Sequence, residues 1–172
     1  MDLPLADLSA LEEIKRLKYR YFRTLDLKEW EEFGDCLAED VRATYGTQAM
    51  GEQLHYESRA AVVEFMSANL GPGVITMHVA NHPEIAIDKQ VDGDTASGSW
   101  GFEDTVIVPD FKIIIRGAGY YRDTYRREAD GAWRITSTDY DRVYEAMTSL
   151  EDTPSFKLIA NRWDPSLQHR AG

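Results

Sequence analysis

The stretch VDGDTASGSWGFEDTVIV, residues 91–108, combines a turn signal with a long strand pattern. Its Asp92-Gly93 pair favours the tight turn of a β-hairpin, because both central residues of that turn take positive φ angles. The residues that follow are rich in β-branched and aromatic side chains, which are typical of strands. The stretch therefore predicts a hairpin whose second strand is unusually long.

Similar strand patterns surround this one, at residues 74–88, 111–127 and 132–146. Asp130-Gly131 supplies a second hairpin signal before the last of them, and Pro109-Asp110 marks the middle joint. Strands of about fifteen residues are long against a usual ~5–6. Sheets of such strands must twist and bend, often through bulges. We therefore predict a strongly curved antiparallel meander.

Helical patterns precede the meander. Residues 9–25 carry an apolar stripe at three- and four-residue spacing, and Ser9 with Glu12 predicts a capping box at its start. Shorter helices are predicted at 28–33 and, after Ser58 as a cap, at 59–70, with a short strand at 41–46 between them. Helices followed by an antiparallel meander predict an α+β fold, a cone with helices over a curved sheet and a pocket inside.

The length and net charge of the chain limit the number of domains and the classes of partner. The chain has 172 residues, which predicts one domain, residues 1–172, whose apolar tail at 148–172 forms a lid or a subunit contact. A formal net charge of −11 disfavours nucleic-acid and anionic-membrane partners. A single cysteine, Cys36, and the lack of a long apolar run or signal-like N-terminus favour a cytoplasmic protein.

Two histidines stand on the predicted strand at 74–88. His78 shares a face with Thr76, and it is either a structural residue or a catalytic base. His82 is followed by Pro83 before Glu84, which indicates a bend that turns it away. A metal site from these histidines is disfavoured, because residues four apart on a strand lie about 13 Å apart. We therefore expect no metal site at these histidines.

Other polar residues have two readings each. Asp26 and Glu29 are either a capping box for the second helix or, through Asp26, part of a site. Tyr21 and Tyr45 are either core residues with satisfied hydroxyls or hydrogen-bond donors in a pocket.

Asp104 lies on the strand face that also carries Trp100 and Phe102. A carboxylate among aromatic side chains needs a partner or a pocket, because burying it bare is unfavourable. Arg142 on the last predicted strand is either half of a surface ion pair or an anion holder at the pocket mouth.

The order of several short motifs resembles a known superfamily. The motifs are YFRTLDLKEWEEF (21–33), VRATY (41–45), Thr76-Met77-His78, DGDTA (92–96) and DGAWRI (130–135). Together they resemble the nuclear transport factor 2-like, or SnoaL-like, superfamily over residues 9–147. The dehydratase branch, with scytalone dehydratase, bile acid 7α-dehydratase and hexachlorocyclohexane dehydrochlorinase, is the most similar. That resemblance implies an α+β cone, no metal or organic cofactor, and a homotrimer, or else a dimer, built through the open sheet face.

The resemblance also implies roles for residues. His78 would be the general base and Asp26 its orienting partner. The implied hydrogen-bond donors are Tyr21 and Tyr45. The implied substrate-positioning residues and pocket walls are Asp104, Arg142, Trp100 and Phe102. The second pocket histidine of scytalone dehydratase has no clear counterpart, which argues against scytalone as substrate.

These parts suit a cofactor-independent lyase. A neutral imidazole held by a carboxylate can abstract a carbon-bound proton, after which water or another β-leaving group departs from a hydrophobic ring substrate, such as a steroid, polyketide or aromatic compound. The alternatives are a ketosteroid-type isomerase or a polyketide cyclase of the same fold. A non-catalytic ligand-binding module and a dioxygenase small-subunit-like module also remain open.

Overall fold

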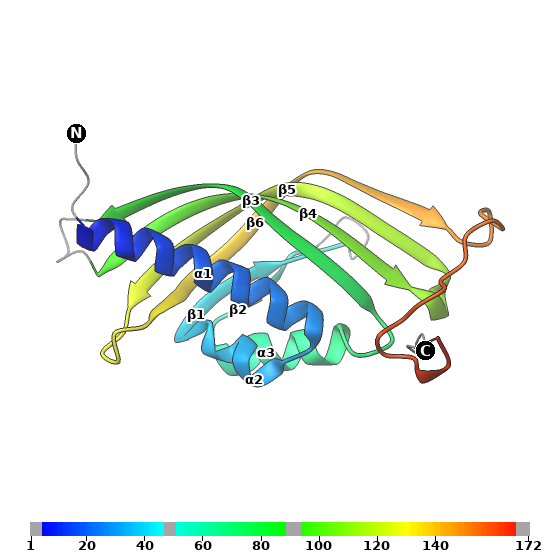
Figure 1. The fold of residues 1–172 in the computed structure, drawn as a ribbon, viewed down its shortest axis with the longest axis horizontal. Coiled ribbons are helices and arrows are strands. Elements are labelled where there is room, and N and C mark those ends of the chain that lie inside the picture. The colour runs from blue at the N-terminus through cyan, green and yellow to red at the C-terminus, as the bar shows by residue number, and fades with distance from the viewer. Residues whose placement is uncertain (1–4, 47–50, 89–93, 168–172) are drawn as a thin grey trace, which may run out of the picture.

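A curved, unclosed six-stranded sheet arches over the first helix of the chain (Figure 1). The computed structural model describes residues 5–46, 51–88 and 94–167. The strands are β1 Leu37–Tyr45, β2 Leu54–Tyr56, β3 Ile75–Asp88, β4 Thr95–Val108, β5 Ile113–Arg127 and β6 Trp133–Ser149. They lie in the order β2-β1-β6-β5-β4-β3, and the predicted α+β fold class is confirmed.

The four long strands β3 to β6 form the predicted antiparallel meander. At the turn before β6, Gly131 has a φ of +82° and the Asp130 carboxylate accepts from the backbone N–H of Ala132. This hairpin is confirmed, whereas the Asp92-Gly93 turn lies outside the described residues. The joint at Pro109-Asp110 is a short 3-10 helix, η1 Pro109–Phe111.

Bulges bend the long strands. The pairing of β3 with β4 shifts register between Asn81 and Glu84, and His82 takes a φ of +48° there. The side chain of His82 is exposed, as the bend predicted from Pro83 requires. A second shift lies between Ala118 and Gly119 in the pairing of β5 with β6. The curvature that makes the cone thus comes from extra residues at defined positions.

The strand β1 joins the meander in an unpredicted way. It begins earlier than the expected 41–46 and pairs in parallel with β6, where Leu37 stands opposite Ile135. The three-residue β2 then pairs antiparallel with β1, Tyr45 opposite Leu54. The sheet therefore carries one parallel pair beside its antiparallel ladder.

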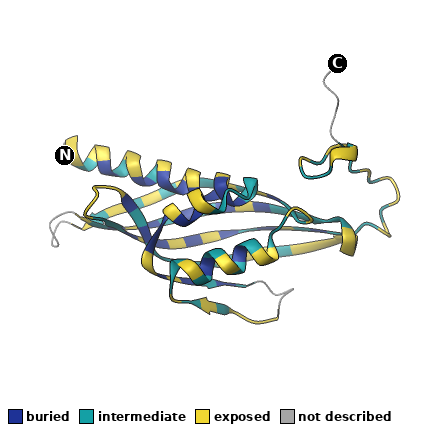
Figure 2. Ribbon diagram, turned by 90° about the horizontal axis from the view of Figure 1, so that it is seen from below, coloured by how far each residue is buried: buried dark blue, intermediate teal, exposed yellow. Residues whose placement is uncertain are grey.

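Three helices lie on the concave side of the sheet: α1 Leu5–Leu27, α2 Trp30–Asp35 and α3 Arg59–Asn69 (Figure 1). Along the long strands, more buried and more exposed residues alternate, most regularly on β5 (Figure 2). The cap predicted at Ser58 is confirmed, because its hydroxyl accepts from the N–H of Ala61 at 3.2 Å. The prediction of a capping box at Ser9 is wrong, because α1 begins earlier and the Ser9 hydroxyl donates to Glu13 within the helix.

The end of α1 has its own geometry. The N–H of Glu29 donates to the carbonyl of Thr24 at 2.9 Å, and that of Lys28 to Leu25 at 3.2 Å. This pair of bonds is a Schellman motif, with Lys28 at the left-handed position (φ +61°) that glycine usually fills. A left-handed backbone costs a non-glycine residue roughly 1–2 kcal/mol. Glu29 caps α2 without a side-chain bond, so the capping box predicted from Asp26 and Glu29 does not form.

A buried ion pair lies in the core between α1 and β5. The Lys18 ammonium is 2.7 Å from a carboxylate oxygen of Asp123, and both side chains are completely buried. The Tyr125 hydroxyl donates to the same oxygen at 2.8 Å, and the Trp100 indole N–H donates to that hydroxyl at 2.7 Å. The Lys18 ammonium also sits 3.7 Å from the centre of the Tyr121 ring. Charge in this core is therefore held by one connected network.

The core tyrosines make stability depend on alkaline pH. Burial raises the pKa of four of them, Tyr21, Tyr45, Tyr121 and Tyr125. The unfolded chain releases these protons near pH 10 and the folded chain does not, so stability falls as pH rises above that value, by ~1.4 kcal/mol per pH unit for each group. Burial lowers the pKa of Lys18, which has the opposite effect but only below about pH 10.5.

We therefore expect cooperative unfolding soon after pH 10.5. Absorbance at 295 nm and circular dichroism, followed together, check this: the buried tyrosines should ionise only as the fold is lost. Full ionisation with unchanged circular dichroism would contradict it.

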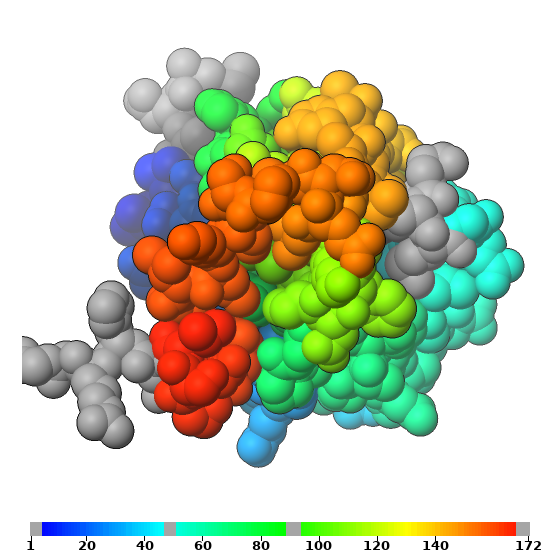
Figure 3. All heavy atoms as spheres, turned by 90° about the vertical axis from the view of Figure 1, so that its right-hand side faces the viewer, coloured from blue at the N-terminus to red at the C-terminus, as the bar shows by residue number. Residues whose placement is uncertain are grey.

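The segment after β6 leaves the end of the sheet. Its first residues bind the turn between β4 and β5, where the N–H of Leu150 donates to the carbonyl of Lys112. Figure 3 shows this end, with the orange and red atoms of the segment next to the yellow-green turn. Between residues 151 and 167, where the description of the chain ends, the only regular element is η2, Pro165–Leu167, and Ile159 is exposed. The role of the segment after β6 as a lid or a subunit contact stays a prediction. Among the described residues, no helix is both long and apolar enough to span a membrane.

Candidate active site

His78 and Asp26 meet at the end of α1, where β3 passes over it. His78 Nδ1 lies 2.7 Å from Asp26 Oδ1. The other carboxylate oxygen, Oδ2, accepts the backbone N–H of His78 at 2.8 Å. The carboxylate is thus fixed through the same residue whose ring it orients.

This contact sets the tautomer of the ring. A carboxylate accepts hydrogen bonds, so Nδ1 carries the proton and Nε2 keeps a lone pair. The imidazole also stacks on Phe22 of α1, with ring centres 5.3 Å apart and planes inclined by 13°. Both contacts restrict ring rotation, and the basic nitrogen has a defined direction.

A second charged pair stands beside Nε2. Asp104 is the cross-strand neighbour of His78, and its Oδ2 lies 4.0 Å from Nε2. Arg142 binds this carboxylate with both arms, Nη1 to Oδ1 at 3.0 Å and Nη2 to Oδ2 at 2.6 Å. Burial works to lower the pKa of Arg142, but its bonds and the charge of Asp104 outweigh this and raise it. The guanidinium is therefore committed to Asp104 and is not a free anion holder.

The contact between Asp104 on β4 and Arg142 on β6 passes over the intervening strand β5 at a glycine. A Cβ atom at Gly117 would lie 1.8 Å from Arg142 Nη1, so only glycine leaves room for the guanidinium. On β6 the register shift lets Arg142 and Glu145, three residues apart, turn to the same side, and Arg142 Nε is 3.1 Å from the Glu145 carboxylate. A bulge and a glycine together place a β6 cation beside a β4 carboxylate.

Two hollows flank the side chains of His78, Asp104 and Arg142. One, of about 390 Å³, lies between α1 and β3 and is lined by Phe22, His78 and Ala80 among others. The second, of about 520 Å³, is lined by Tyr140 and Arg142. The Tyr140 hydroxyl fixes its edge, because it donates to the carbonyl of Gly46 at 2.9 Å and accepts from the N–H of Gly46 at 3.2 Å.

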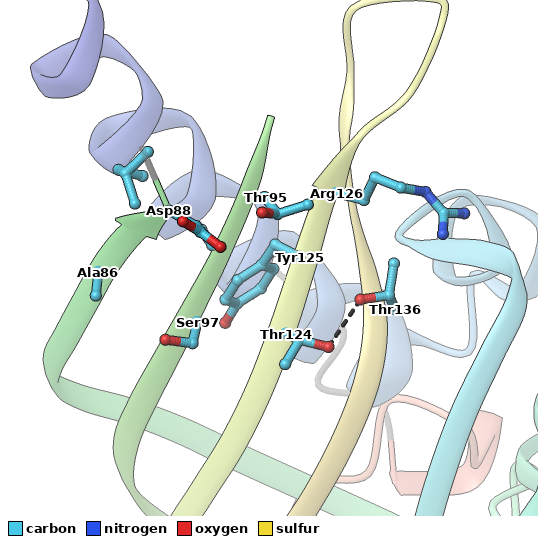
Figure 4. A pocket seen from close by; sticks show the side chains of 10 residues that line it. Ala86, Asp88, Thr95, Ser97, Thr124, Tyr125, Arg126 and Thr136 are labelled. Atoms are coloured by element: carbon cyan, nitrogen blue, oxygen red, sulfur yellow. Dashed lines mark hydrogen bonds between the residues drawn. The ribbon is translucent and has the colours of Figure 1, made fainter. Parts of the chain in front are cut away.

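A third hollow, of about 570 Å³, lies over the far ends of β3 to β6 (Figure 4). Hydroxyls of Ser97, Thr124 and Thr136 line it, and the last two are 2.8 Å apart. None of the residues predicted for the site lines this hollow, and we assign it no role.

The predicted site residues fall into two groups. The structure brings together Asp26, His78, Asp104 and Arg142. The four aromatic residues predicted for the site lie deeper, in the core: Tyr21, Tyr45, Trp100 and Phe102.

The deeper residues have internal partners. The hydroxyls of Tyr21 and Tyr45 are 2.9 Å apart, and burial raises the pKa of both, so both stay protonated at neutral pH. Trp100 is fully buried and bonds Tyr125. Phe102 lies under Arg142, with the guanidinium carbon 5.4 Å from its ring centre. None of the four lines the hollow beside His78, whose aromatic lining residues are Tyr19 and Phe22.

Sequence reasoning missed several contributors. The Thr76 hydroxyl donates to Asp26 Oδ1 at 2.8 Å, and Lys28 Nζ donates to Thr76 at 3.2 Å. Thr76 carried a signal, because it shares the face of His78, but Lys28 carried none. Within the described ranges, no three His, Cys, Asp or Glu side chains form a possible metal-ligand set.

The sequence of this chain matches the model of a known family. The model of the SnoaL-like domain matches residues 6–139 of this chain. The chain belongs to the SnoaL-like domain family, within the nuclear transport factor 2-like superfamily. The cone with helices on its concave side is thus the SnoaL-like fold.

Solved structures share this SnoaL-like fold at low sequence identity. A hexachlorocyclohexane dehydrochlorinase, LinA type 2, is 16% identical over 84% of this chain and 93% of its own, with a TM-score of 0.72. A protein described as a scytalone dehydratase, from Novosphingobium aromaticivorans, is 18% identical over 81% and 88%, with a TM-score of 0.70. ActVI-ORFA from Streptomyces coelicolor is 14% identical over 78% and 98%, with a TM-score of 0.63.

Proposed function

We propose that this SnoaL-like protein is an enzyme, a cofactor-independent lyase in which His78 is the general base. The observation that carries the proposal is the orientation of the imidazole. Asp26 holds Nδ1 at 2.7 Å, which leaves the lone pair on Nε2, and the ring borders an apolar hollow. A neutral imidazole is a suitable base near pH 7.

The proposed step needs only side chains of this chain. Nε2 takes a proton from a carbon next to an electron-withdrawing group, the C–H electron pair forms a double bond, and the bond to the β-leaving group breaks. When the leaving group is hydroxide, the imidazolium returns the proton to it and water is released. The transient imidazolium lies between Asp26 and Asp104, whose carboxylates favour it. Arg142 holds the Asp104 carboxylate in place.

Tyr21 and Tyr45 are the proposed hydrogen-bond donors to the substrate oxygen. Tyr21 and Tyr45 are protonated and close to each other, but their hydroxyls satisfy one another. We propose that a substrate oxygen which reaches this pair replaces that mutual bond. Tyr21→Phe and Tyr45→Phe variants measure whether either hydroxyl acts in turnover.

The substrate class follows from the hollow beside His78. Its wall includes Phe22, Leu27 and Ala80, which suits a hydrophobic ring compound. The structural neighbours described as a dehydrochlorinase and a scytalone dehydratase support an elimination. We therefore propose ring compounds that carry a hydroxyl or halide β to an acidic C–H bond.

The test is a product-mass assay with purified protein. The panel contains cyclic β-hydroxy ketones, scytalone and γ-hexachlorocyclohexane, with the His78→Ala variant as blank. Loss of 18 or 36 mass units, for water or HCl, supports the lyase. An unchanged product mass supports the isomerase alternative, which uses the same base for a proton shuttle. Binding without turnover across the panel would favour a ligand-binding module.

We also propose that the protein is a homotrimer. The outward face of the sheet exposes large apolar side chains on three strands: Met77, Val79, Tyr120 and Tyr144. Such exposure on a sheet favours association. Light scattering after size exclusion is expected to give three times the chain mass of 19.6 kDa. Tyr120→Glu should shift the mass to that of one chain, whereas Tyr19→Glu on α1, exposed to a similar extent, should not. A monomeric wild type would contradict the proposal.

A further inference from the structure

Lys28 occupies a backbone position that glycine usually fills. It is the left-handed residue of the Schellman motif after α1, with a φ of +61°. Glycine would adopt this conformation without strain. The backbone therefore gives no reason for a lysine here, and the reason must lie in its side chain.

The side chain of Lys28 reaches the catalytic pair through one hydroxyl. Its ammonium donates to Thr76 Oγ1 at 3.2 Å, and Thr76 Oγ1 donates to Asp26 Oδ1 at 2.8 Å. That carboxylate oxygen is the one that accepts from His78 Nδ1 at 2.7 Å. Four groups from the helix end and β3 thus form one chain of hydrogen bonds.

The direction of this chain is fixed by its first member. An ammonium has three donors and no acceptor, so the Thr76 oxygen must accept from it. The single hydroxyl hydrogen of Thr76 is then directed to Asp26. Without Lys28, the hydroxyl could rotate and donate elsewhere, and Asp26 Oδ1 would lose one of its two partners.

Lys28 also brings charge close to the pair. Burial lowers the pKa of Lys28, while the charge of Asp26 opposes that shift. Three further charged groups face or adjoin the imidazole: Asp26 on α1, Asp104 on β4, and Arg142 on β6 behind Asp104. Arg23 lines the same hollow but is paired with Glu29 and Glu32.

We propose that Lys28 and Thr76 are positioning residues, which fix the Asp26 carboxylate toward His78 and set the pH at which His78 acts as a base. The catalytic part of this inference rests on the proposed function. The positioning of Asp26 and His78 can be tested on the protein without substrate, whatever it catalyses. Neither residue needs to touch the substrate, so the effect is expected in kcat and in pH dependence rather than in KM.

The test uses NMR of the imidazole signals of His78 in the protein without substrate. Lys28→Met and Lys28→Gly remove a positive charge, which makes the imidazolium easier to form. The midpoint of the His78 titration should therefore rise by about half a pH unit. Thr76→Val should raise it as well, because Asp26 becomes less satisfied, and Lys28→Arg should restore the wild-type midpoint. The Nδ1–H signal should exchange faster in the Met, Gly and Val variants.

Lys112 provides a matched control. It is also a lysine in the left-handed region, with a φ of +53°, but its ammonium pairs with Glu151 at 2.7 Å, at the far turn between β4 and β5. Lys112→Gly should leave the His78 midpoint and proton exchange unchanged. Lys28→Gly should retain the full unfolding transition, because glycine adopts that left-handed backbone without strain. A change in the His78 signals of this variant would therefore report on positioning and not on a loss of the fold.

Two results remain distinguishable. Equal midpoints and exchange rates in wild type, Lys28→Met and Thr76→Val would overturn the positioning role, whatever the protein catalyses. Shifted midpoints without turnover of any panel compound would keep the positioning role and reject the proposed function. With a substrate in hand, Lys28→Met should lower kcat about three- to tenfold at neutral pH, leave KM unchanged, and move the acid limb of the rate profile to higher pH.

Discussion

Replacing His78 by alanine is expected to lower turnover by about 10²–10⁴-fold, the range that general acid–base catalysis usually contributes. The fold should survive, because Asp26 keeps its bonds from the Thr76 hydroxyl and from the backbone N–H of residue 78. The free energy of unfolding should fall by less than about 2 kcal/mol, mostly from the lost stacking on Phe22.

The measurement pairs initial rates on any converted panel compound with urea unfolding of the same preparations. His82→Asn is the matched control, because His82 lies on the same strand, is exposed, and has a left-handed φ of +48° that asparagine tolerates. It should keep wild-type rates. Wild-type rates for His78→Ala, or loss of its fold together with its activity, would reject the assignment of His78 as the base.

Replacing Lys18 by methionine is expected to produce the largest loss of stability, about 3–5 kcal/mol. Lys18 and Asp123 are both completely buried, 2.7 Å apart. Methionine conserves most of the volume but leaves the Asp123 carboxylate with the Tyr125 hydroxyl as its remaining donor. An uncompensated buried charge is costly because protein atoms solvate it poorly.

Urea unfolding at pH 7 measures this loss, and two variants frame it. Lys15→Met on the same helix removes a partly exposed lysine that lies 3.6 Å from Glu12, and it should change stability by less than about 0.5 kcal/mol. The double variant Lys18→Met/Asp123→Leu removes both charges and should recover a large part of the loss. A single variant as stable as wild type would show that the pair is not charged in the folded protein.

The parts of the fold that local sequence specifies were predicted well. The meander rests on alternation and turn residues, and the strands from β3 to β6 lie within a few residues of their predicted ranges. The bend at His82 followed from Pro83, a residue without a backbone N–H for the ladder. The parallel pairing of β1 with β6 has no local signal, because nothing near residue 37 indicates a partner near 135.

The candidate site shows the same division. The resemblance of motifs placed His78, Asp26, Asp104 and Arg142, and the structure brings these four together. Pattern alone could not show that Trp100 is enclosed in the core, because strand alternation gives the face of a sheet and not the depth within a cone. Lys28 was missed for a related reason, since its role depends on a turn geometry and on a contact with residue 76.

The parallel contact between β1 and β6 has a consequence for synthesis of the chain. Leu37 pairs with Ile135, about a hundred residues later, and closing so long a loop precedes any gain from the contact. On the ribosome, β1 must wait until β6 has emerged, and α1 must wait for the arch above it. The nascent chain therefore exposes the apolar stripe of α1 and one edge of β1 during most of its translation, so early folding should depend on chaperones that shield apolar segments.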